Sequence, residues 1–452
     1  MAAHERHAVP EGHAKHGPLT DFSRKPLQIK SGCFNLAIMY KTRNLTTKLR
    51  QLAAAFPAVA LTGARQVGKT TLLRHLFPDH DYVVFDPTQD LENARQDPDL
   101  FFLNHPHPIL LDEIQYAPEL VSAIKRQIDA HPDRRGYYLI TGSQQWQVMS
   151  HLAESLAGRV ALLELSGFSL TELEGTPNGW LDAWLTSPEG FLDRFHPPSL
   201  YPAHLSEWIW RGTLPKVQEL PLSLVPDFWN SYHRTYVERD ARLAGNVQDW
   251  QEFGRFVRLL SALTAQEINY SQLGREIGLT PPTARRWLRI LEATYQWHEL
   301  PALTNNLVKR ISSRPKGHWG ESGLACFHAQ ISSPQSLTGH PLYGALFETA
   351  MVNDLIKQAA MLPLKPSCHH WRSAGGAEVD LVMDRDGTLH PFEIKLTTQP
   401  TKRHASGLEA FRATHPNAGP GALICAVPAP RWITPQVLAI PWNLSTGTNP
   451  PD

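Results

Sequence analysis

The sequence has little cysteine, no net charge and no long hydrophobic run. Its four cysteines stand far apart and include no Cys-x-x-Cys pair, which argues against a disulfide framework or a structural zinc site. No apolar stretch approaches the roughly 18 residues that cross a bilayer, and the start lacks the basic-then-apolar order of a secretory signal. We therefore expect a protein of the reducing cytoplasm with no membrane partner.

Positive and negative side chains are equal in number, with 43 lysines and arginines against 43 aspartates and glutamates. No global field therefore draws the chain to nucleic acid or to a membrane surface, and any site for a polyanion has to be local. A chain of 452 residues has room for about two or three domains, each with a core of its own.

Residues 1–38 differ in composition from the rest of the chain. Four histidines fall among the first sixteen residues, and no apolar period is present. We expect a disordered tail, and the irregular spacing of the histidines argues against a metal site. Because a helical pattern begins just after Met39, we also expect Met39 to be the native first residue.

From Phe56 onward, short apolar runs alternate with segments of helical spacing. The runs AVALTG, DYVVFD, PILLDE and GYYLITG are apolar on both faces, as buried parallel strands are. Helices or loops separate the runs, which is typical of a parallel sheet covered by helices on both sides. The pattern predicts an α/β domain over residues 39–175.

The stretch from Gly63 to Thr70 reads GARQVGKT and matches G-x-x-x-x-G-K-[ST]. It stands between a predicted strand and a predicted helix, as a phosphate-binding loop does. Its glycines allow the backbone to wrap around phosphate oxygens, and its N–H groups and the helix N-terminus supply donors and positive potential. The alternative, a glycine turn with an incidental lysine, does not account for the flanking strand and helix.

Within this loop, Lys69 is expected to reach the β- and γ-phosphates of a nucleotide. Thr70 is expected to place its hydroxyl on Mg²⁺, and Thr71 to complete the donors near the α-phosphate. The predicted nucleotide contacts are Gly63, Ala64, Arg65, Gln66, Val67, Gly68, Lys69, Thr70 and Thr71. The predicted cofactors are ATP and Mg²⁺.

Two acids end the predicted strand HPILLDE. Asp112 is expected to hold Mg²⁺ through water, and Glu113 to orient the attacking water. The next predicted strand ends in Thr141, Gly142 and Ser143, whose hydroxyls are expected to contact the γ-phosphate or that water. Alternatively, the two acids only solvate the tip of a strand, and Thr-Gly-Ser is ordinary turn chemistry.

The segments LTGARQVGKTTLL, LLDEIQ, LITGSQQ and SLAGRV resemble a family of prokaryotic AAA+-like ATP-binding proteins. The resemblance covers most of the chain from Met39 on, and that family has a separate C-terminal domain of uncertain role. It implies ATP hydrolysis, in which Arg159 stabilises transition-state charge in cis or from a neighbouring subunit. AAA+ relatives often form rings, so a homo-oligomer is also expected. Alternatively, Arg159 only caps the preceding helix.

Residues 176–245 begin with a stretch rich in proline and glycine, as in a lid or linker. WRGTLPKV and YHRTYVERDARL then resemble two further signatures of the same family. The second of these carries Glu238, Arg239 and Asp240, which we expect either to make an interdomain contact or to form a solvated face.

Residues 246–315 carry a helix-turn-helix layout, a short helix, a glycine-bearing turn and a second helix opened by a Thr-Pro pair. Arg285 and Arg289 fall on one face of the second helix, with Arg286 beside them. One interpretation is a winged helix that contacts DNA, with LVKRISSRPKG as its wing. The alternative is a packing or protein-contact module.

Residues 316–445 hold a second set of charged residues. GAEVDLVMDRDGTLHPFEIKL reads as a β-hairpin with Asp380 on its first strand and Glu393 and Lys395 on its second. Residues two apart on a strand share a face, so Glu393 and Lys395 point together and Asp380 opposes them. Two acids that hold Mg²⁺ and a lysine that positions or deprotonates water are what metal-dependent phosphodiester cleavage requires.

This arrangement resembles the D-x(n)-E-x-K core of the PD-(D/E)XK nuclease superfamily. Glu348, on a predicted helix upstream, falls where that superfamily often adds an acid. The resemblance implies a restriction-endonuclease-like α/β domain with catalytic residues Glu348, Asp380, Glu393 and Lys395. Asp380 and Glu393 are its expected metal ligands. The alternative is a surface hairpin with a cross-strand ion pair. CHHW at 368–371 is not expected to bind a metal, because adjacent side chains cannot all face one ion.

The sequence thus predicts an N-terminal P-loop ATPase, a winged-helix-like middle and a nuclease-like C-terminal domain. One interpretation couples ATP hydrolysis to the binding or metal-dependent cleavage of DNA. The other is an ATP-driven regulatory switch that acts through protein partners, in which the nuclease-like fold is a catalytically silent scaffold.

Overall fold

The structure is a computed structural model, and it describes residues 40–85, 92–143, 156–175, 179–188, 190–192, 204–237, 241, 247, 249–304 and 313–444. The predicted tail, the predicted start at Met39, the charged triplet at 238–240 and most of the predicted wing lie outside these residues.

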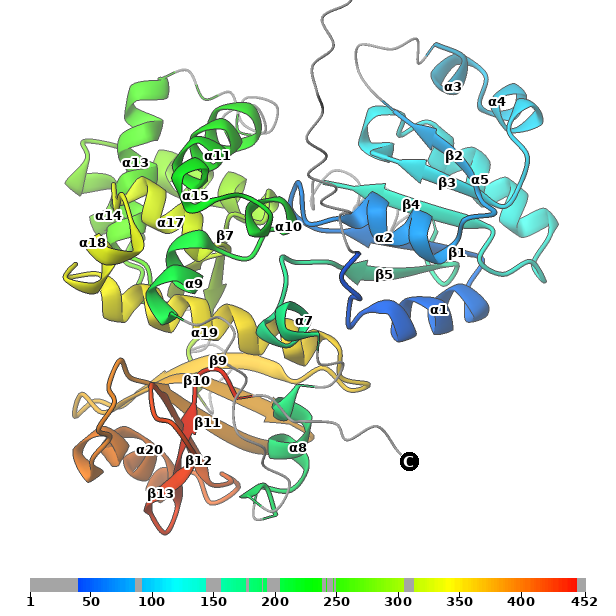
Figure 1. Ribbon diagram of the computed structural model, residues 1–452. Helices are drawn as coiled ribbons and strands as arrows, with labels where there is room; N and C mark the ends of the chain where they lie inside the picture. The colour runs from blue at the N-terminus through cyan, green and yellow to red at the C-terminus, as the bar shows by residue number, and fades with distance from the viewer. Residues whose placement is uncertain are drawn as a thin grey trace, which may run out of the picture. The chain divides into compact units, whose positions relative to one another are not determined.

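The N-terminal part is built on a five-stranded parallel sheet ordered β2-β3-β4-β1-β5 (Figure 1). Its strands are β1 (Ala58–Thr62), β2 (Asp81–Val84), β3 (Ile109–Asp112), β4 (Tyr138–Gly142) and β5 (Val160–Glu164). The first four are the apolar runs of the sequence, and the predicted α/β domain is confirmed. Most of their side chains are buried because helices cover both faces of the sheet.

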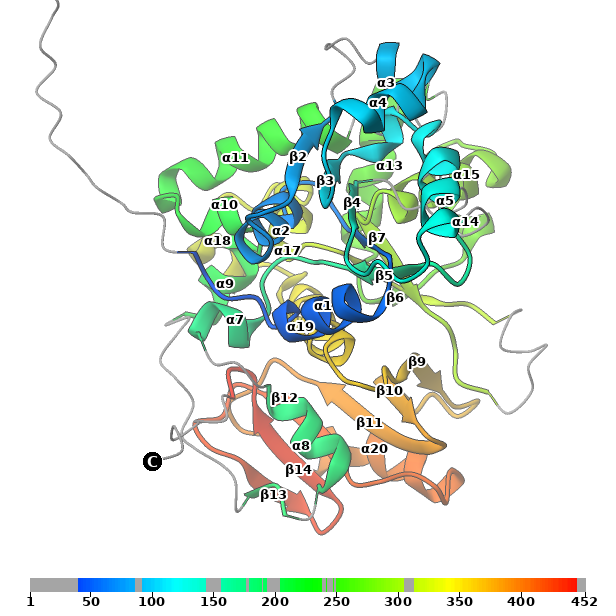
Figure 2. The ribbon, with the colours of Figure 1, turned by 90° about the vertical axis from the view of Figure 1, so that its right-hand side faces the viewer.

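On one face, α1 (Thr46–Ala55) contacts β1 and α2 (Lys69–Leu76) contacts β4. The other face carries α3 (Glu92–Gln96), α4 (Pro98–Asn104), the short η1 (Ile114–Tyr116) and α5 (Leu120–Ala130) (Figure 2). Alternate strand residues such as Ala58 and Ala60 join these helices in one apolar core. This layering places the carboxyl ends of β1, β3 and β4 at the same edge of the sheet.

A series of short helices follows β5: α7 (Leu170–Glu174), α8 (Trp180–Thr186), α9 (Leu205–Arg211), α10 (Pro215–Gln218), η3 (Leu222–Leu224), α11 (Val225–Tyr232) and η4 (His233–Val237). α8 falls in the predicted lid or linker. It instead contacts α19 of the C-terminal domain, and the ring of its Trp180 lies 6.5 Å from the ring of Phe392.

The middle of the chain contains α13 (Trp250–Ala262), α14 (Tyr270–Glu276) and α15 (Pro281–Ala293). It also has a three-stranded antiparallel sheet ordered β6-β8-β7, formed by β6 (Gln266–Glu267), β7 (Trp297–Leu300) and β8 (Lys316–Trp319). The two helices of the predicted helix-turn-helix are present as α14 and α15. The hydroxyl of Thr280 accepts the N–H of Thr283, as an N-cap does.

The strand β8 corrects the predicted boundary between the middle and C-terminal domains. The sequence places Lys316 and Gly317 at the end of a wing and the start of the C-terminal domain at residue 316. In the structure Lys316–Trp319 pairs with both β6 and β7, as the strand after a wing can, so the sheet of the middle part extends past that boundary. The next helices, α17 (Ser322–His328) and α18 (Pro334–Thr338), contact α9, so the C-terminal domain begins with α19.

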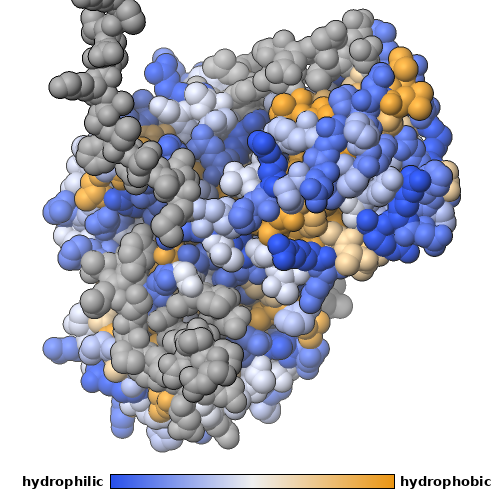
Figure 3. All heavy atoms as spheres, turned by 45° about the vertical axis from the view of Figure 1, so that its right-hand side comes forward, coloured by the Kyte–Doolittle hydropathy of each residue, from blue (hydrophilic) through white to orange (hydrophobic). Residues whose placement is uncertain are grey.

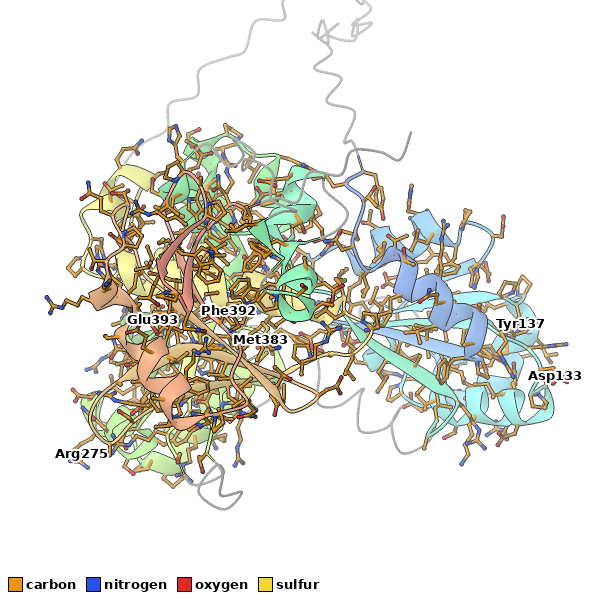
Figure 4. The ribbon with its side chains drawn as sticks, turned by 90° about the horizontal axis from the view of Figure 1, so that it is seen from below. Asp133, Tyr137, Arg275, Met383, Phe392 and Glu393 are labelled. Carbon is orange, nitrogen blue, oxygen red and sulfur yellow. The ribbon has the colours of Figure 1, made fainter. Side chains whose placement is uncertain are left out.

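The C-terminal domain has a six-stranded sheet ordered β13-β14-β12-β11-β10-β9. Its elements are α19 (Tyr343–Ala360), β9 (Ser367–Arg372), β10 (Glu378–Arg385), β11 (Thr388–Ile394), α20 (Lys402–Thr414), β12 (Gly421–Cys425), β13 (Arg431–Thr434) and β14 (Val437–Pro441). Leu408 and Phe411 of α20 pack with Val379 and Leu423 in one apolar core. α19 contacts β11, and Figure 4 labels Phe392 and Glu393 on that strand.

The predicted hairpin is confirmed. β10 and β11 are antiparallel, with Arg385 opposite Thr388, so that the turn consists of Asp386 and Gly387. Both turn residues have positive φ, 52° and 78°, as a type I′ turn requires. The Asp-Gly pair therefore fixes the register that brings Asp380 opposite Glu393.

The surface agrees with the absence of long hydrophobic runs. Figure 3 shows a largely hydrophilic face with small, separate hydrophobic groups. Within the described ranges, no helix is both long and apolar enough to span a bilayer.

Gly407 tests the packing of α20 on the hairpin, because an added Cβ there would collide with the carbonyl oxygen of Glu378. Overpacking of this kind costs about 1–3 kcal/mol. We expect Gly407→Ala to lower the free energy of unfolding by that amount in urea denaturation. The control is Gly344→Ala on α19, where no atom lies within 4 Å of the added Cβ. Equal stability of the two variants would contradict this packing.

Candidate nucleotide site and a second charged cluster

The loop between β1 and α2 has the backbone that a phosphate-binding loop needs. Gly63, Gln66 and Gly68 have positive φ of 137°, 63° and 94°. A Cβ at position 63 would collide with the carbonyl oxygen of Leu165, so only glycine fits there. α2 begins directly after Gly68, and the N–H groups at the start of a helix, which have no partner within the helix, can bind an anion.

Lys69 lies within this loop and is only 5% exposed. Its ammonium donates hydrogen bonds to the carbonyl oxygens of Gly63 and Ala64, both at 2.9 Å. The loop thus holds the positive charge where the phosphates of a nucleotide would meet it.

Asp112, at the end of β3, is the centre of a network of hydroxyl groups. The hydroxyl of Thr70 lies 2.9 Å from both of its carboxylate oxygens, and the hydroxyl of Tyr82 donates to it at 2.9 Å. Thr141 donates to it as well. Burial, together with the negative charge of Asp112, raises the pKa of Tyr82 to about 12. Thr70 and Asp112 therefore stand side by side next to the phosphate loop, as predicted from the sequence.

Glu113 is held beside this network in a left-handed backbone conformation with a φ of 58°. Its N–H donates to the hydroxyl of Thr141 at 3.0 Å, and its carboxylate accepts from Ser143 at 2.9 Å. The amide of Gln115 donates to the Glu113 carboxylate and, at 3.1 Å, to Ser143. A non-glycine residue at positive φ is uncommon and clusters at functional sites.

Sequence reasoning singled out Ser143 and missed Gln115 and Tyr82. The signal for Gln115 was its place two residues after Glu113 in LLDEIQ. Tyr82 stands in the expected strand DYVVFD, where a tyrosine is also an ordinary strand residue.

Arg159 lies at the amino ends of the strands, whereas the phosphate loop lies at their carboxyl ends. Its carbonyl oxygen accepts the N–H of Ala58, the first residue of β1, whereas the loop follows the last residue of that strand. A strand of five residues spans about 17 Å. The guanidinium pairs with Asp129 at 2.6 Å. A role for Arg159 in cis therefore does not fit the structure, and a role from a neighbouring subunit stays a prediction.

Arg43, which precedes α1, contacts the phosphate loop from outside the motif. Its guanidinium donates to the carbonyl oxygens of Val67 at 2.8 Å and Ser166 at 2.6 Å, and it pairs with Glu172 at 3.0 Å. Arg43 and Glu172 are both buried. Nothing in the sequence pattern distinguishes Arg43 from the other basic residues near α1.

A cavity of about 990 Å³ opens beside the phosphate loop. Ala64 and Val67 of the loop and Gly167 after β5 line one side of it, and Tyr295 and Lys357 also line it. This volume lies within the range of small-molecule and cofactor sites, which is about 300–1,000 Å³.

The second charged cluster lies in the C-terminal domain and unites the four predicted residues. The ammonium of Lys395 lies 2.7 Å from the Glu393 carboxylate and 3.5 Å from the Asp380 carboxylate. The N–H of Ile394 donates to Asp380 at 2.9 Å. Glu348 reaches the same cluster from α19, which contacts β11.

Lys316 is a member of this cluster that sequence reasoning did not identify. Its ammonium lies 2.6 Å from Glu348, 2.8 Å from Asp380 and 2.9 Å from Glu378, and its side chain is only 2% exposed. In the sequence, Lys316 stands at the end of the basic segment LVKRISSRPKG, where a wing residue would contact DNA. Its strand β8 pairs with β7 and with the two-residue strand β6, and β6 has no sequence signature.

The ionisation of the cluster follows from burial and from the two ammonium groups. Burial, with the charge of Asp380 added, raises the pKa of Glu348 and that of Glu393 to about 8. Burial alone would raise the pKa of Asp380 too, but the charges of Lys316 and Lys395 lower it. Three nearby carboxylates raise the pKa of Lys316 well above its ordinary value against the opposing effect of burial.

Over the described part of the chain, no three His, Cys, Asp or Glu side chains are grouped so that they could hold a metal ion. The predicted metal ligands Asp380 and Glu393 lie close together, but their carboxylates form ion pairs with lysines. The phosphate-loop pair of Thr70 and Asp112 differs in kind, because phosphate oxygens complete the coordination of Mg²⁺ in such sites.

Comparison with known proteins agrees with the N-terminal site. Residues 55–174 match the family model of an AAA domain. These residues form an AAA-type P-loop domain. Residues 202–335 and 343–444 match two further models, each described as a domain of unknown function, DUF8612 and DUF4143. The start of the second match at residue 343 coincides with the start of α19.

Uncharacterized proteins of Mycobacterium tuberculosis and Mycobacterium bovis are 28% identical to this chain over 367 residues, which is 80% of this chain and 76% of theirs. The Walker-type ATPase of Pyrococcus abyssi is 15% identical, with 63% of this chain and 94% of that chain covered and a TM-score of 0.34. For the RuvB Holliday junction branch migration motor of Thermotoga maritima, the values are 15%, 60%, 94% and 0.29.

Lys69 should be needed for nucleotide binding by the P-loop domain. A hydrogen bond to a charged group is worth about 1.5–3 kcal/mol, so we expect Lys69→Ala to weaken MgATP binding by about tenfold to a hundredfold in calorimetric titration. The control is Lys125→Ala on α5, which removes an exposed lysine and should leave binding unchanged. Equal affinity of the two variants would contradict the assigned phosphate contact.

Proposed function

We propose that this chain is an ATP hydrolase in which the ATPase domain binds ATP with Mg²⁺ and transfers the γ-phosphoryl group to water. The observation that carries the proposal is the contact of Thr70 with both carboxylate oxygens of Asp112, at 2.9 Å, directly beside the phosphate loop. A hydroxyl and a carboxylate at this position are the protein ligands that P-loop ATPases use for Mg²⁺.

Binding of the triphosphate would use the phosphate loop as it stands. The ammonium of Lys69 would exchange its hydrogen bonds to the carbonyls of Gly63 and Ala64 for bonds to β- and γ-phosphate oxygens. The N–H groups at the start of α2 would donate to the remaining oxygens. The cavity beside Ala64 and Val67 has room for the nucleoside.

Thr70 and Asp112 would hold Mg²⁺, Thr70 directly and Asp112 through water. When bound, Mg²⁺ neutralises charge on the β- and γ-phosphates. The hydroxyls of Tyr82 and Thr141 keep the Asp112 carboxylate in place by donating to it.

Glu113 would act as the general base. Its carboxylate would take a proton from the attacking water, the new bond would form between the water oxygen and the γ-phosphorus, and ADP would leave with the electron pair of the broken bond. Ser143 and Gln115 orient that carboxylate through their hydrogen bonds. The positive φ of Glu113 turns its side chain toward Ser143.

Replacing the base should separate binding from turnover. General bases contribute about 10²–10⁴-fold to rates, so we expect Glu113→Gln to bind MgATP with wild-type affinity and to release phosphate at least about a hundredfold more slowly. The control is Glu119→Gln, which changes an exposed acid six residues away and should keep wild-type turnover. Retained hydrolysis in Glu113→Gln would overturn the assignment of the base.

A second activity, DNA binding by the middle of the chain, is supported by α15. Arg285, Arg286 and Arg289 are exposed on this helix. The order of α13, β6, α14, α15, β7 and β8, with the sheet order β6-β8-β7, is consistent with a winged helix whose second motif helix enters the major groove. The guanidinium of Arg285 lies over the ring of Tyr270 at 4.9 Å, which positions it at the helix surface.

Salt-dependent gel shifts test this activity. If α15 contacts phosphates, Arg285→Ala combined with Arg289→Ala should weaken DNA binding. The slope of log affinity against log salt concentration should become shallower by about two, because two phosphate contacts are lost. Arg126→Ala, an exposed arginine on α5, should have no effect. Unchanged affinity in the double variant would identify α15 as a packing module.

A further inference from the structure

The C-terminal domain has the chain order helix, three strands, helix, strand, formed by α19, β9, β10, β11, α20 and β12. Asp380 lies on the second of these strands, Glu393 lies on the third, and Lys395 follows directly. The PD-(D/E)XK resemblance implies a divalent metal held by Asp380 and Glu393, with Glu348 as a further acid nearby. Whether a metal fits is decided by what the carboxylates already contact.

We infer that the Lys316 ammonium is a built-in cation in the position where a PD-(D/E)XK-type site would hold its metal, and that the C-terminal domain is a metal-independent scaffold. This is an inference about the C-terminal domain, and it is independent of ATP hydrolysis by the N-terminal domain.

Each acid of the cluster already has an ammonium partner. Lys316 lies within 3 Å of Glu348, Glu378 and Asp380, at 2.6, 2.9 and 2.8 Å. Lys395 lies 2.7 Å from Glu393 and 3.5 Å from Asp380. Each carboxylate of the cluster therefore has a cation within 3 Å, while Glu348 Oε1 and Glu393 Oε2 accept no hydrogen bond.

A divalent ion could not join this arrangement without displacing an ammonium group. Mg²⁺ binds oxygen at about 2.1 Å, so an ion shared by Asp380 and Glu393 would lie against the ammonium of Lys395. An ion shared by Asp380 and Glu348 would lie against the ammonium of Lys316. Two positive centres at such a distance repel strongly in a buried site, where water does not screen them. The ammonium and the metal are therefore alternatives for one position.

Lys316 is also fixed in place by its backbone. Its strand β8 pairs on one side with Glu267 of β6 and on the other with Leu300 of β7. The neighbouring Gly317 packs so closely on Trp297 that an added Cβ would collide with the indole ring. A lysine that left this cluster would leave buried carboxylates unpaired, which is costly, so the exchange of lysine for metal is opposed.

The positive role of the contact is to join two parts of the chain. Lys316 comes from the sheet of the middle part, whereas Glu348, Glu378 and Asp380 belong to the C-terminal domain. In this arrangement the acids bind Lys316 of β8 instead of a metal. The C-terminal domain then stabilises the packing of the chain and does not act as a nuclease.

Manganese binding to nucleotide-free protein tests this inference. Free Mn²⁺ is measured by electron paramagnetic resonance in wild type, Asp380→Asn, Lys316→Met and the double variant of these two substitutions. We expect the same Mn²⁺ binding in wild type and Asp380→Asn. In Lys316→Met we expect one new Mn²⁺ site, with an affinity at least about tenfold higher than the affinity of the wild-type cluster for Mn²⁺. The reason is that removal of the ammonium leaves the carboxylates free to bind the ion. The double variant should lose that site again.

Two results would overturn the inference. One is a Mn²⁺ ion bound by wild type and lost in Asp380→Asn. The other is a folded Lys316→Met protein that gains no site. If Lys316→Met does not fold, the comparison of wild type with Asp380→Asn still decides the question, because it requires neither ammonium to be removed.

Plasmid incubation gives an independent readout. Wild type with Mg²⁺ or Mn²⁺ should leave supercoiled DNA intact, as Lys395→Ala does. Cleavage by wild type that Lys395→Ala abolishes would show that the cluster takes a catalytic metal despite Lys316, and it would overturn the inference.

Discussion

Every charge that this chain takes out of water has to be paired at short range, and this constraint shapes both of its charged sites. The buried ammonium of Lys69 is bonded to loop carbonyls, the buried guanidinium of Arg43 to Glu172, and the buried ammonium of Lys316 to three carboxylates. An unpaired buried ion would cost several kcal/mol. The two sites differ in what supplies the partner. Phosphates can replace the carbonyl partners of Lys69, whereas the carboxylates around Lys316 are supplied by the chain itself.

One of these pairs, Arg43 with Glu172, takes part in the connection between the P-loop domain and the C-terminal domain. Arg43 links the loop carbonyl of Val67 to Glu172 of α7, and the N–H of Leu170 in that helix donates to Asp354 of α19 at 2.7 Å. Asp354 is buried, and burial raises its pKa. Two turns earlier on α19, Glu348 contacts Lys316. Buried polar contacts thus join the phosphate loop to α19, the helix that also carries Glu348 of the second cluster.

Residues of the candidate nucleotide site could be predicted where local spacing fixes geometry. The phosphate loop, the acids that end β3 and the Asp-Gly hairpin each follow from a few consecutive residues, since strand alternation and turn chemistry place their side chains. Lys316 and Arg43 could not be predicted, because their partners lie far along the chain and depend on pairing across strands and helices. Arg159 shows the converse: its place after SLAG suggested a catalytic arginine, but the register of β5 puts it at the far edge of the sheet.

The most direct test of the central claim is phosphate release from MgATP by the purified wild-type protein, compared with the same reaction in excess EDTA and with Asp112→Asn. The account predicts steady phosphate release that needs Mg²⁺ and that Asp112→Asn loses. Folded wild-type protein that neither releases phosphate nor binds MgATP would contradict it.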